Sequence, residues 1–164
     1  MTKPYYTPEN FQAANSVGYL LKRCGTRMTQ IAEGRFEGQP ISFTQWIILI
    51  RLTQQEHLSP TNLTEHLGYD MGALTRIVDD LQKKGLVVRE RGEHDRRAVQ
   101  IKATPEGQRL AIATIDSVVD LANDLVEPYT QAETDQVISL LQRLLVHMEE
   151  ISERPVAARR KSKA

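Results

Sequence analysis

The chain has 164 residues, enough for one domain or two small ones whose folding buries roughly 70% of the unfolded chain's surface. With 40% hydrophobic and 26% charged residues the composition is that of an ordinary globular protein, which excludes the fibrous and disordered classes. No apolar run approaches the ~20 residues that span a bilayer, and residues 1–10 lack the apolar core of a signal peptide. We therefore expect a cytoplasmic protein.

The formal net charge is zero, with 21 basic and 21 acidic residues, but the two signs are segregated along the chain. Residues 71–102 carry eight basic and five acidic groups, residues 103–153 carry two and ten, and residues 154–164 carry five and none. At physiological salt, charges more than about 8 Å apart are largely screened, so a local basic patch attracts phosphate whatever the total. The zero sum therefore does not exclude a nucleic-acid partner.

The N-terminal third predicts two helices. Thr7 followed by Pro8 is typical of a helix start, and apolar residues at 3/4 spacing continue to about Phe36. Glycines and a proline then break the chain, and Thr44 is expected to cap a second, strongly apolar helix over residues 45–54. The first helix is long and one-sided, which is typical of a helix that packs against a partner.

The next segment predicts two short helices separated by a tight turn. Ser59 and Pro60 repeat the cap-then-proline pattern, and Gly68 is the expected end of that third helix. Asp70 is expected to cap a fourth helix that runs to Lys84. Its buried stripe, at i, i+3, i+4, i+7 spacing, comprises Leu74, Ile77, Val78 and Leu81.

After the fourth helix the hydrophobic period changes from 3.6 to 2, which predicts a β-hairpin over residues 86–91 and 98–103 with a charged tip. Thr104 and Pro105 open a fifth helix that is expected to last to about Val126. Thr130 and Glu133 form a capping box for a sixth helix with heptad-spaced apolar residues, and the basic residues 154–164 are expected to be disordered.

The fifth helix has two apolar faces, one more than a single core requires. This surplus predicts that both ends of the chain pack together and against a second copy; a monomeric bundle is the alternative. The expected division is an N-terminal dimerisation region (1–40), a central lobe (41–104), C-terminal dimerisation helices (105–153) and a tail (154–164).

The order helix, short helix, turn, amphipathic helix and charged hairpin in residues 41–104 is that of a winged helix-turn-helix DNA-binding lobe, in a protein that is otherwise mainly α. The fourth helix turns small residues, Gly72 and Ala73, and possible donors, Thr75 and Arg76, away from its apolar stripe. The alternative is a solvated helix face, with Arg76–Asp80 and Asp79–Lys83 as weak ion pairs. Basic residues beside the hairpin tip favour DNA contact. These tip residues are Arg89, Arg91, Arg96 and Arg97.

Several motifs at fixed separation resemble the multiple-antibiotic-resistance regulator (MarR) family: residues 72–76 (Gly-Ala-Leu-Thr-Arg), 84–87 (Lys-Gly-Leu-Val), 95–97 (Asp-Arg-Arg) and 104–107 (Thr-Pro-Glu-Gly). The resemblance implies a homodimeric regulator, most often a repressor, that binds a pseudo-palindromic DNA operator. It implies a wing arginine in the minor groove at Arg97, oriented by Asp95, and a phosphate contact at Arg89. The full set of expected DNA contacts is Pro60, Thr61, Asn62, Gly72, Ala73, Thr75, Arg76, Lys83, Arg89, Asp95, Arg96 and Arg97. Asp79 and Asp80 make the helix less basic than in most relatives, and one of them is a candidate acceptor from a cytosine amine.

The resemblance also implies release from DNA by a small, phenolic or anionic effector. The candidate residues for such a cleft are Tyr19, Arg23, Arg27, Trp46, His66 and Tyr69. No cofactor or metal is expected. A zinc site would need a cluster of His, Cys or carboxylate ligands, and the only residues with even partial spacing for one are His57, Glu65, His66 and Asp70.

Three other functions are alternatives to this interpretation. An enzyme is disfavoured because the chain has no nucleophile-and-base motif or phosphate-binding loop. A cysteine-based redox sensor is disfavoured because Gly18 stands where peroxide-sensing relatives place their cysteine; Cys24 is interpreted as a buried small hydrophobe. The third alternative, a winged helix that binds other proteins and no specific DNA, stays open.

Overall fold

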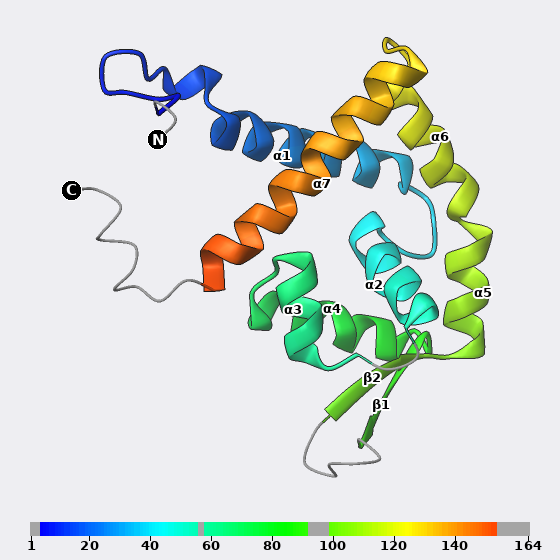
Figure 1. The fold of residues 1–164 in the computed structure, drawn as a ribbon. Helices are drawn as coiled ribbons and strands as arrows, with labels where there is room; N and C mark the ends of the chain where they lie inside the picture. The colour runs from blue at the N-terminus through cyan, green and yellow to red at the C-terminus, as the bar shows by residue number, and fades with distance from the viewer. Residues whose placement is uncertain (1–3, 56–57, 92–98, 154–164) are drawn as a thin grey trace. The chain divides into compact units, whose positions relative to one another are not determined.

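Figure 1 shows the computed structural model, which describes residues 4–55, 58–91 and 99–153. The chain forms two compact units, Met1–Leu121 and Ala122–Ala164. The first contains η1 (Ala13–Asn15), α1 (Val17–Arg35), α2 (Phe43–Gln54), α3 (Pro60–Leu67), α4 (Met71–Lys83), β1 (Val87–Arg91), β2 (Val99–Ala103), α5 (Pro105–Ala113) and most of α6 (Ile115–Val126). The second holds the end of α6 and α7 (Gln131–Glu153). The predicted fold class, mainly helical with one hairpin, is confirmed.

The first long helix begins at Val17, ten residues later than the Thr7 predicted from sequence. Residues 7–10 instead close a single turn, in which the Thr7 N–H donates to the Asn10 side chain at 2.7 Å. Pro8 fits that turn as well as it fits a helix start. The helix is capped by Ser16, whose hydroxyl accepts from a backbone N–H of the first turn.

The N-terminus of α2 is capped by Ser42 and not by Thr44. Ser42 and Gln45 form a capping box, each side chain accepting from the other residue's backbone N–H at 3.2 Å. The Thr44 hydroxyl donates to the Glu33 carboxylate of α1 at 2.6 Å. The prediction of Thr44 as the cap was therefore wrong by two residues, and its hydroxyl joins α1 to α2.

The caps predicted for α3 and α4 are confirmed. Ser59 caps α3 with Pro60 in its first turn, and α3 ends at Gly68, which has a φ of 69° that only glycine adopts readily. The Asp70 carboxylate accepts from the Ala73 N–H at 2.8 Å and so caps α4. The short turn between these ends places α3 and α4 as neighbours (Figure 1).

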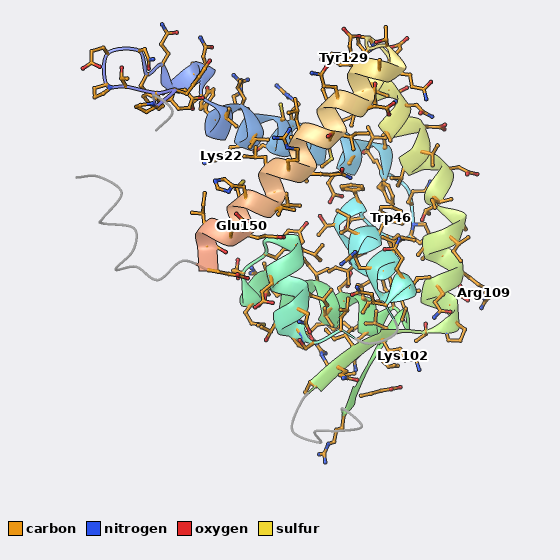
Figure 2. All side chains as sticks on the ribbon, in the orientation of Figure 1. Lys22, Trp46, Lys102, Arg109, Tyr129 and Glu150 are labelled. Atoms are coloured by element: carbon orange, nitrogen blue, oxygen red, sulfur yellow. The ribbon has the colours of Figure 1, made fainter. Side chains whose placement is uncertain are left out.

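The predicted fifth helix is interrupted at Thr114, so that α5 and α6 are two helices. The indole N–H of Trp46 on α2 donates to the Ala111 carbonyl at 2.9 Å, and the Thr114 hydroxyl donates to the Leu110 carbonyl at 2.9 Å. Side-chain donors that enter the carbonyl ladder are a known cause of helix breaks. Figure 2 shows Trp46 on the side of α2 that faces α5.

The hairpin consists of β1 and β2 in antiparallel register, with Val87 opposite Ala103 and Arg91 opposite Val99. Leu58, just before α3, exchanges two backbone hydrogen bonds with Ile101 and so anchors the hairpin to the helices. The hairpin base joins one hydrophobic core with α2, α3, α4 and α5. Its most deeply buried large side chains include Ile48, Leu49, Leu52, Leu63, Leu74, Leu81 and Ile101.

In the second unit, α7 begins with the predicted capping box, since the Glu133 carboxylate accepts from the Thr130 N–H at 2.9 Å. None of the residues of α7, all within the described part of the chain, is buried. The described residues form no helix that is both long and apolar enough to cross a membrane.

Candidate nucleic-acid interface

The face of α4 opposite the core is the one that the sequence predicted. Leu74, Val78 and Leu81 are buried, while Ile77 is half-buried against them. The opposite side presents small and polar residues with little or no cover. They are Gly72, Thr75, Arg76 and Lys83, with Ala73 half-buried beside them. A helix of this kind can bring its backbone close to a surface and still offer side-chain donors.

Arg76 is the side chain on this face that is best placed to bind an outside group. Its guanidinium forms no ion pair or hydrogen bond with another described residue. The hydroxyl of neighbouring Thr75 donates to the Met71 carbonyl at 2.7 Å, which leaves its oxygen lone pairs as acceptors. The donor role expected of Thr75 is thus used within the helix, and Arg76 carries the free donors.

Asp80 faces the N-terminal end of α2. Its carboxylate accepts from the Gln45 amide at 2.6 Å and pairs with the Lys84 ammonium at 3.1 Å. These two hydrogen bonds, of which the one from Lys84 has the larger effect, hold the pKa of Asp80 below its ordinary value. The Arg76–Asp80 pair considered from the sequence is therefore replaced by Asp80–Lys84.

Asp79 connects α4 to the hairpin. The Arg89 guanidinium on β1 pairs with the Asp79 carboxylate at 2.5 Å and donates to the Gln82 side chain at 2.6 Å. The Asp79–Lys83 pair considered from the sequence is thus replaced by Asp79–Arg89. Both carboxylates of α4 have partners within the protein, and Arg89 is held on α4 in this structure.

The other predicted contacts lie on α3 and on the wing. Thr61 is exposed, Pro60 is half-buried, and the Asn62 side chain completes the α3 cap with Ser59. Asp95, Arg96 and Arg97 belong to residues 92–98, which lie outside the described residues. The structure thus places the α3 and α4 candidates on one lobe.

The candidate effector residues do not form one group. Tyr19 and Arg23 meet on α1, with the guanidinium 5.9 Å from the ring centre, and both are exposed. Trp46 is buried in the core with its indole N–H bonded, and Tyr69 is half-buried against that core. The structure further places Arg27 exposed on α1, whereas the His66 side chain lies outside what it describes.

Side-chain positions also bear on two alternatives, the cysteine-based redox sensor and a metal site. Cys24 is exposed, contrary to the burial expected for it, because α1 packs against the core mainly through Met28 and Ala32 near its C-terminal end. Within the described ranges no three His, Cys, Asp or Glu side chains are arranged to hold a metal ion, and His57 falls outside those ranges.

Two residues whose side chains connect helices, Gln45 and Glu33, were not predicted from the sequence. Gln45 is almost fully buried and bonds to both Asp80 and Lys84 of the α4 region. Glu33 of α1 accepts hydrogen bonds from the first residues of α2. The Ser42-x-x-Gln45 capping-box pattern was the available signal for Gln45, whereas nothing in the sequence pattern pairs Glu33 with α2.

Residues 41–99, which run from just before α2 to the first residue of β2, match the model of the MarR family. The chain is 30% identical over 105 residues to the HTH-type transcriptional regulator SarZ of Staphylococcus epidermidis, covering 64% of this chain and 70% of that protein. The chain belongs to the MarR family. This MarR-family chain is also 25% identical over 139 residues to the transcriptional repressor MprA of Escherichia coli, covering 82% and 79% of the two chains.

The fold of this MarR-family protein matches the crystal structure of an Escherichia coli MarR variant complexed with operator DNA. The TM-score is 0.70 at 27% identity, over 79% of this chain and 93% of the other. The protein is therefore a DNA-binding transcriptional regulator of the winged-helix type and not an enzyme. The family membership and the regulatory function predicted from the sequence motifs are confirmed.

Proposed function

We propose that this MarR-family protein acts as a homodimer whose two α4 helices enter successive major grooves of a pseudo-palindromic operator. The observation that carries this proposal is the exposed face of α4, where Arg76 has no partner among the described residues and stands beside Gly72 and Thr75. An arginine in that position can donate two hydrogen bonds to guanine, and half-sites for such a dimer lie about ten base pairs apart.

Exposed apolar side chains on α7 support the dimer. Val137, Leu141, Met148 and Ile151 recur at heptad spacing and are each more than 40% exposed. Further exposed apolar residues lie on α6, including Ile115, Val119 and Leu125. A soluble monomer rarely leaves so many large apolar side chains of two helices exposed, so a second copy is their proposed cover.

We further propose that DNA binding represses transcription in the cytoplasm and that a small aromatic or anionic effector releases the protein. The repressor name of the relative MprA supports the first part. For the second, the Tyr19–Arg23 pair on α1 offers a ring and a cation to such a molecule. Arg97 and its neighbours in residues 92–98 keep their proposed role as wing contacts on the strength of the sequence resemblance.

A gel-shift titration with DNA from upstream of the protein's own gene tests this function. We expect a discrete complex that persists against excess non-specific DNA and weakens steeply with salt. Adding a panel of phenolic and anionic metabolites should release the DNA for at least one compound. A protein that binds all sequences equally, or none, would contradict specific regulation and favour the protein-binding alternative.

The Arg76→Ala variant is expected to lose about 1–3 kcal/mol of binding free energy at one base pair of each half-site, because Arg76 is proposed to read a base and not a phosphate. The measurement is a competition series in which each operator base pair is changed in turn. The control is Arg109→Ala, since Arg109 is exposed on α5, pairs with Glu106 and points away from α4 (Figure 2). A uniform loss over all operator variants would identify Arg76 as a phosphate contact.

The Asp79→Asn variant is expected to make DNA binding more salt-dependent. Asp79 holds the Arg89 guanidinium at 2.5 Å, so removing its charge frees Arg89 for a phosphate. Each added phosphate contact steepens the plot of log K against log salt concentration by about 0.9. We expect that change per protomer, with a stability loss below about 1 kcal/mol since the ion pair is partly exposed. An unchanged slope would show that Arg89 stays on α4 or already contacts DNA.

A further inference from the structure

A small polar cluster joins the recognition helix α4 to the start of α2. The Gln45 amide donates to the Asp80 carboxylate at 2.6 Å, and the Lys84 ammonium donates to the Gln45 carbonyl at 3.0 Å. Lys84 also pairs with Asp80 at 3.1 Å, so each of the three side chains contacts the other two. Gln45 is only 8% exposed, so one of the three side chains is buried within the lobe.

Two further sets of contacts lie between this cluster and α1. Lys84 donates to the Pro40 carbonyl, in the segment between α1 and α2, at 3.2 Å. At the end of α1, the Glu33 carboxylate accepts from the Phe43 N–H at 3.1 Å and from the Thr44 N–H at 3.0 Å. The first turn of α2 is therefore bonded on one side to Glu33 of α1, through the Phe43 and Thr44 N–H groups, and on the other side to the C-terminal end of α4, through the Gln45 side chain.

The cluster adds little to stability, since the Asp80 and Lys84 side chains are 50% and 37% exposed and exposed ion pairs contribute little. The buried apolar stripe of α4 already holds the helix on the core. The cluster instead fixes the direction of the α4 axis, because the charge-assisted hydrogen bond from the buried Gln45 amide to Asp80 holds the end of α4 in one position. For a 13-residue helix about 20 Å long, a tilt of about 5° at one end moves the other end by about 1.7 Å. The base-reading residues lie toward that other end.

We propose that Gln45 and Asp80 are positioning residues, which set the direction of α4 relative to α1 and thereby the half-site spacing that the dimer accepts. The inference rests on the proposed function, in which α4 reads DNA, and on the sequence-based expectation that residues 1–40, which include α1, belong to the dimerisation region.

The test measures affinity for operators whose half-sites are moved apart or together by one base pair. We expect the wild-type protein to lose at least 30-fold in affinity on either change. For Asp80→Asn, which keeps the shape of the side chain but removes its charge, we expect that penalty to shrink to about 3-fold. Affinity for the best operator should fall less than 10-fold, and the melting temperature should stay within about 2 °C, as expected for an exposed pair.

Two more variants separate positioning from folding. Asp80→Glu keeps the charge and should restore much of the wild-type spacing preference, whereas Lys84→Met should broaden it as Asp80→Asn does. Glu106→Gln is the matched control, because it removes an exposed ion pair with Arg109 on α5 and should leave the spacing preference unchanged.

Three other outcomes would overturn either the positioning role or the proposed function itself. A wild-type spacing profile in Asp80→Asn overturns the positioning role while the proposed DNA binding stands. An equal loss at every spacing, accompanied by a lower melting temperature, assigns Asp80 to stability and also overturns it. A wild-type protein that binds no operator overturns the proposed function itself, and the positioning role with it.

Discussion

The Gly107→Ala variant is expected to lose about 3 kcal/mol of unfolding free energy, at the upper end of overpacking effects. A Cβ on residue 107 would lie 2.1 Å from the Leu86 carbonyl oxygen and 3.1 Å from the Leu49 side chain. The Leu86 oxygen cannot move away freely, because it accepts from the Thr104 N–H at 3.0 Å at the base of the hairpin. Denaturant unfolding followed by circular dichroism measures the loss.

Gly34→Ala is the matched control, since Gly34 lies in the last turn of α1 and a Cβ there meets nothing within 4 Å. Alanine is the better helix former by up to about 1 kcal/mol, so this variant should be as stable as the wild type or more stable. If Gly107→Ala unfolds at the wild-type denaturant concentration, the close approach of α5 to the hairpin is not as the structure shows it.

The Leu141→Asp variant is expected to weaken the dimer by about 100-fold or more. Leu141 lies midway along the heptad-spaced face of α7 and is 47% exposed. In a two-fold symmetric interface the change acts twice, and each copy buries an unpaired carboxylate at a cost of at least 2 kcal/mol. Sedimentation velocity across a concentration series measures the dissociation constant, and operator affinity should fall with it.

The control for this variant is Gln136→Asp, which adds the same charge to α7 on a side turned well away from Leu141. Its dissociation constant should stay within about 3-fold of the wild-type value, as is usual for a substitution outside an interface. A Leu141→Asp protein that remains a dimer at the wild-type concentration would show that the α7 face is covered in some other way.

Local signals explain why α3 and α4 were predicted well. The Ser59 and Asp70 caps and the Gly68 end act within three or four residues of the chain, so the sequence contains them in full. The start of α1 and the break at Thr114 depend on distant partners. The Tyr6 hydroxyl accepts from the Val17 N–H, and the Trp46 indole reaches Ala111, 65 residues away in sequence.

The same distinction applies to the candidate site. The exposed face of α4 follows from helical periodicity, and the position of Arg76 on it was therefore predictable. The ion pairs were not, because spacing rules consider only neighbours on one helix. Asp80 binds Gln45 from a helix 35 residues earlier, and Asp79 binds Arg89 from the following strand.

Selection of binding sites from a random double-stranded DNA library tests the dimeric, base-reading function most directly. We expect the wild-type protein at physiological salt to enrich one sequence made of two inverted half-sites about ten base pairs apart. The Arg76→Ala variant should enrich the same arrangement with one relaxed position in each half. A library that remains unenriched, or that yields a single half-site without symmetry, would contradict the dimeric recognition proposed for this protein.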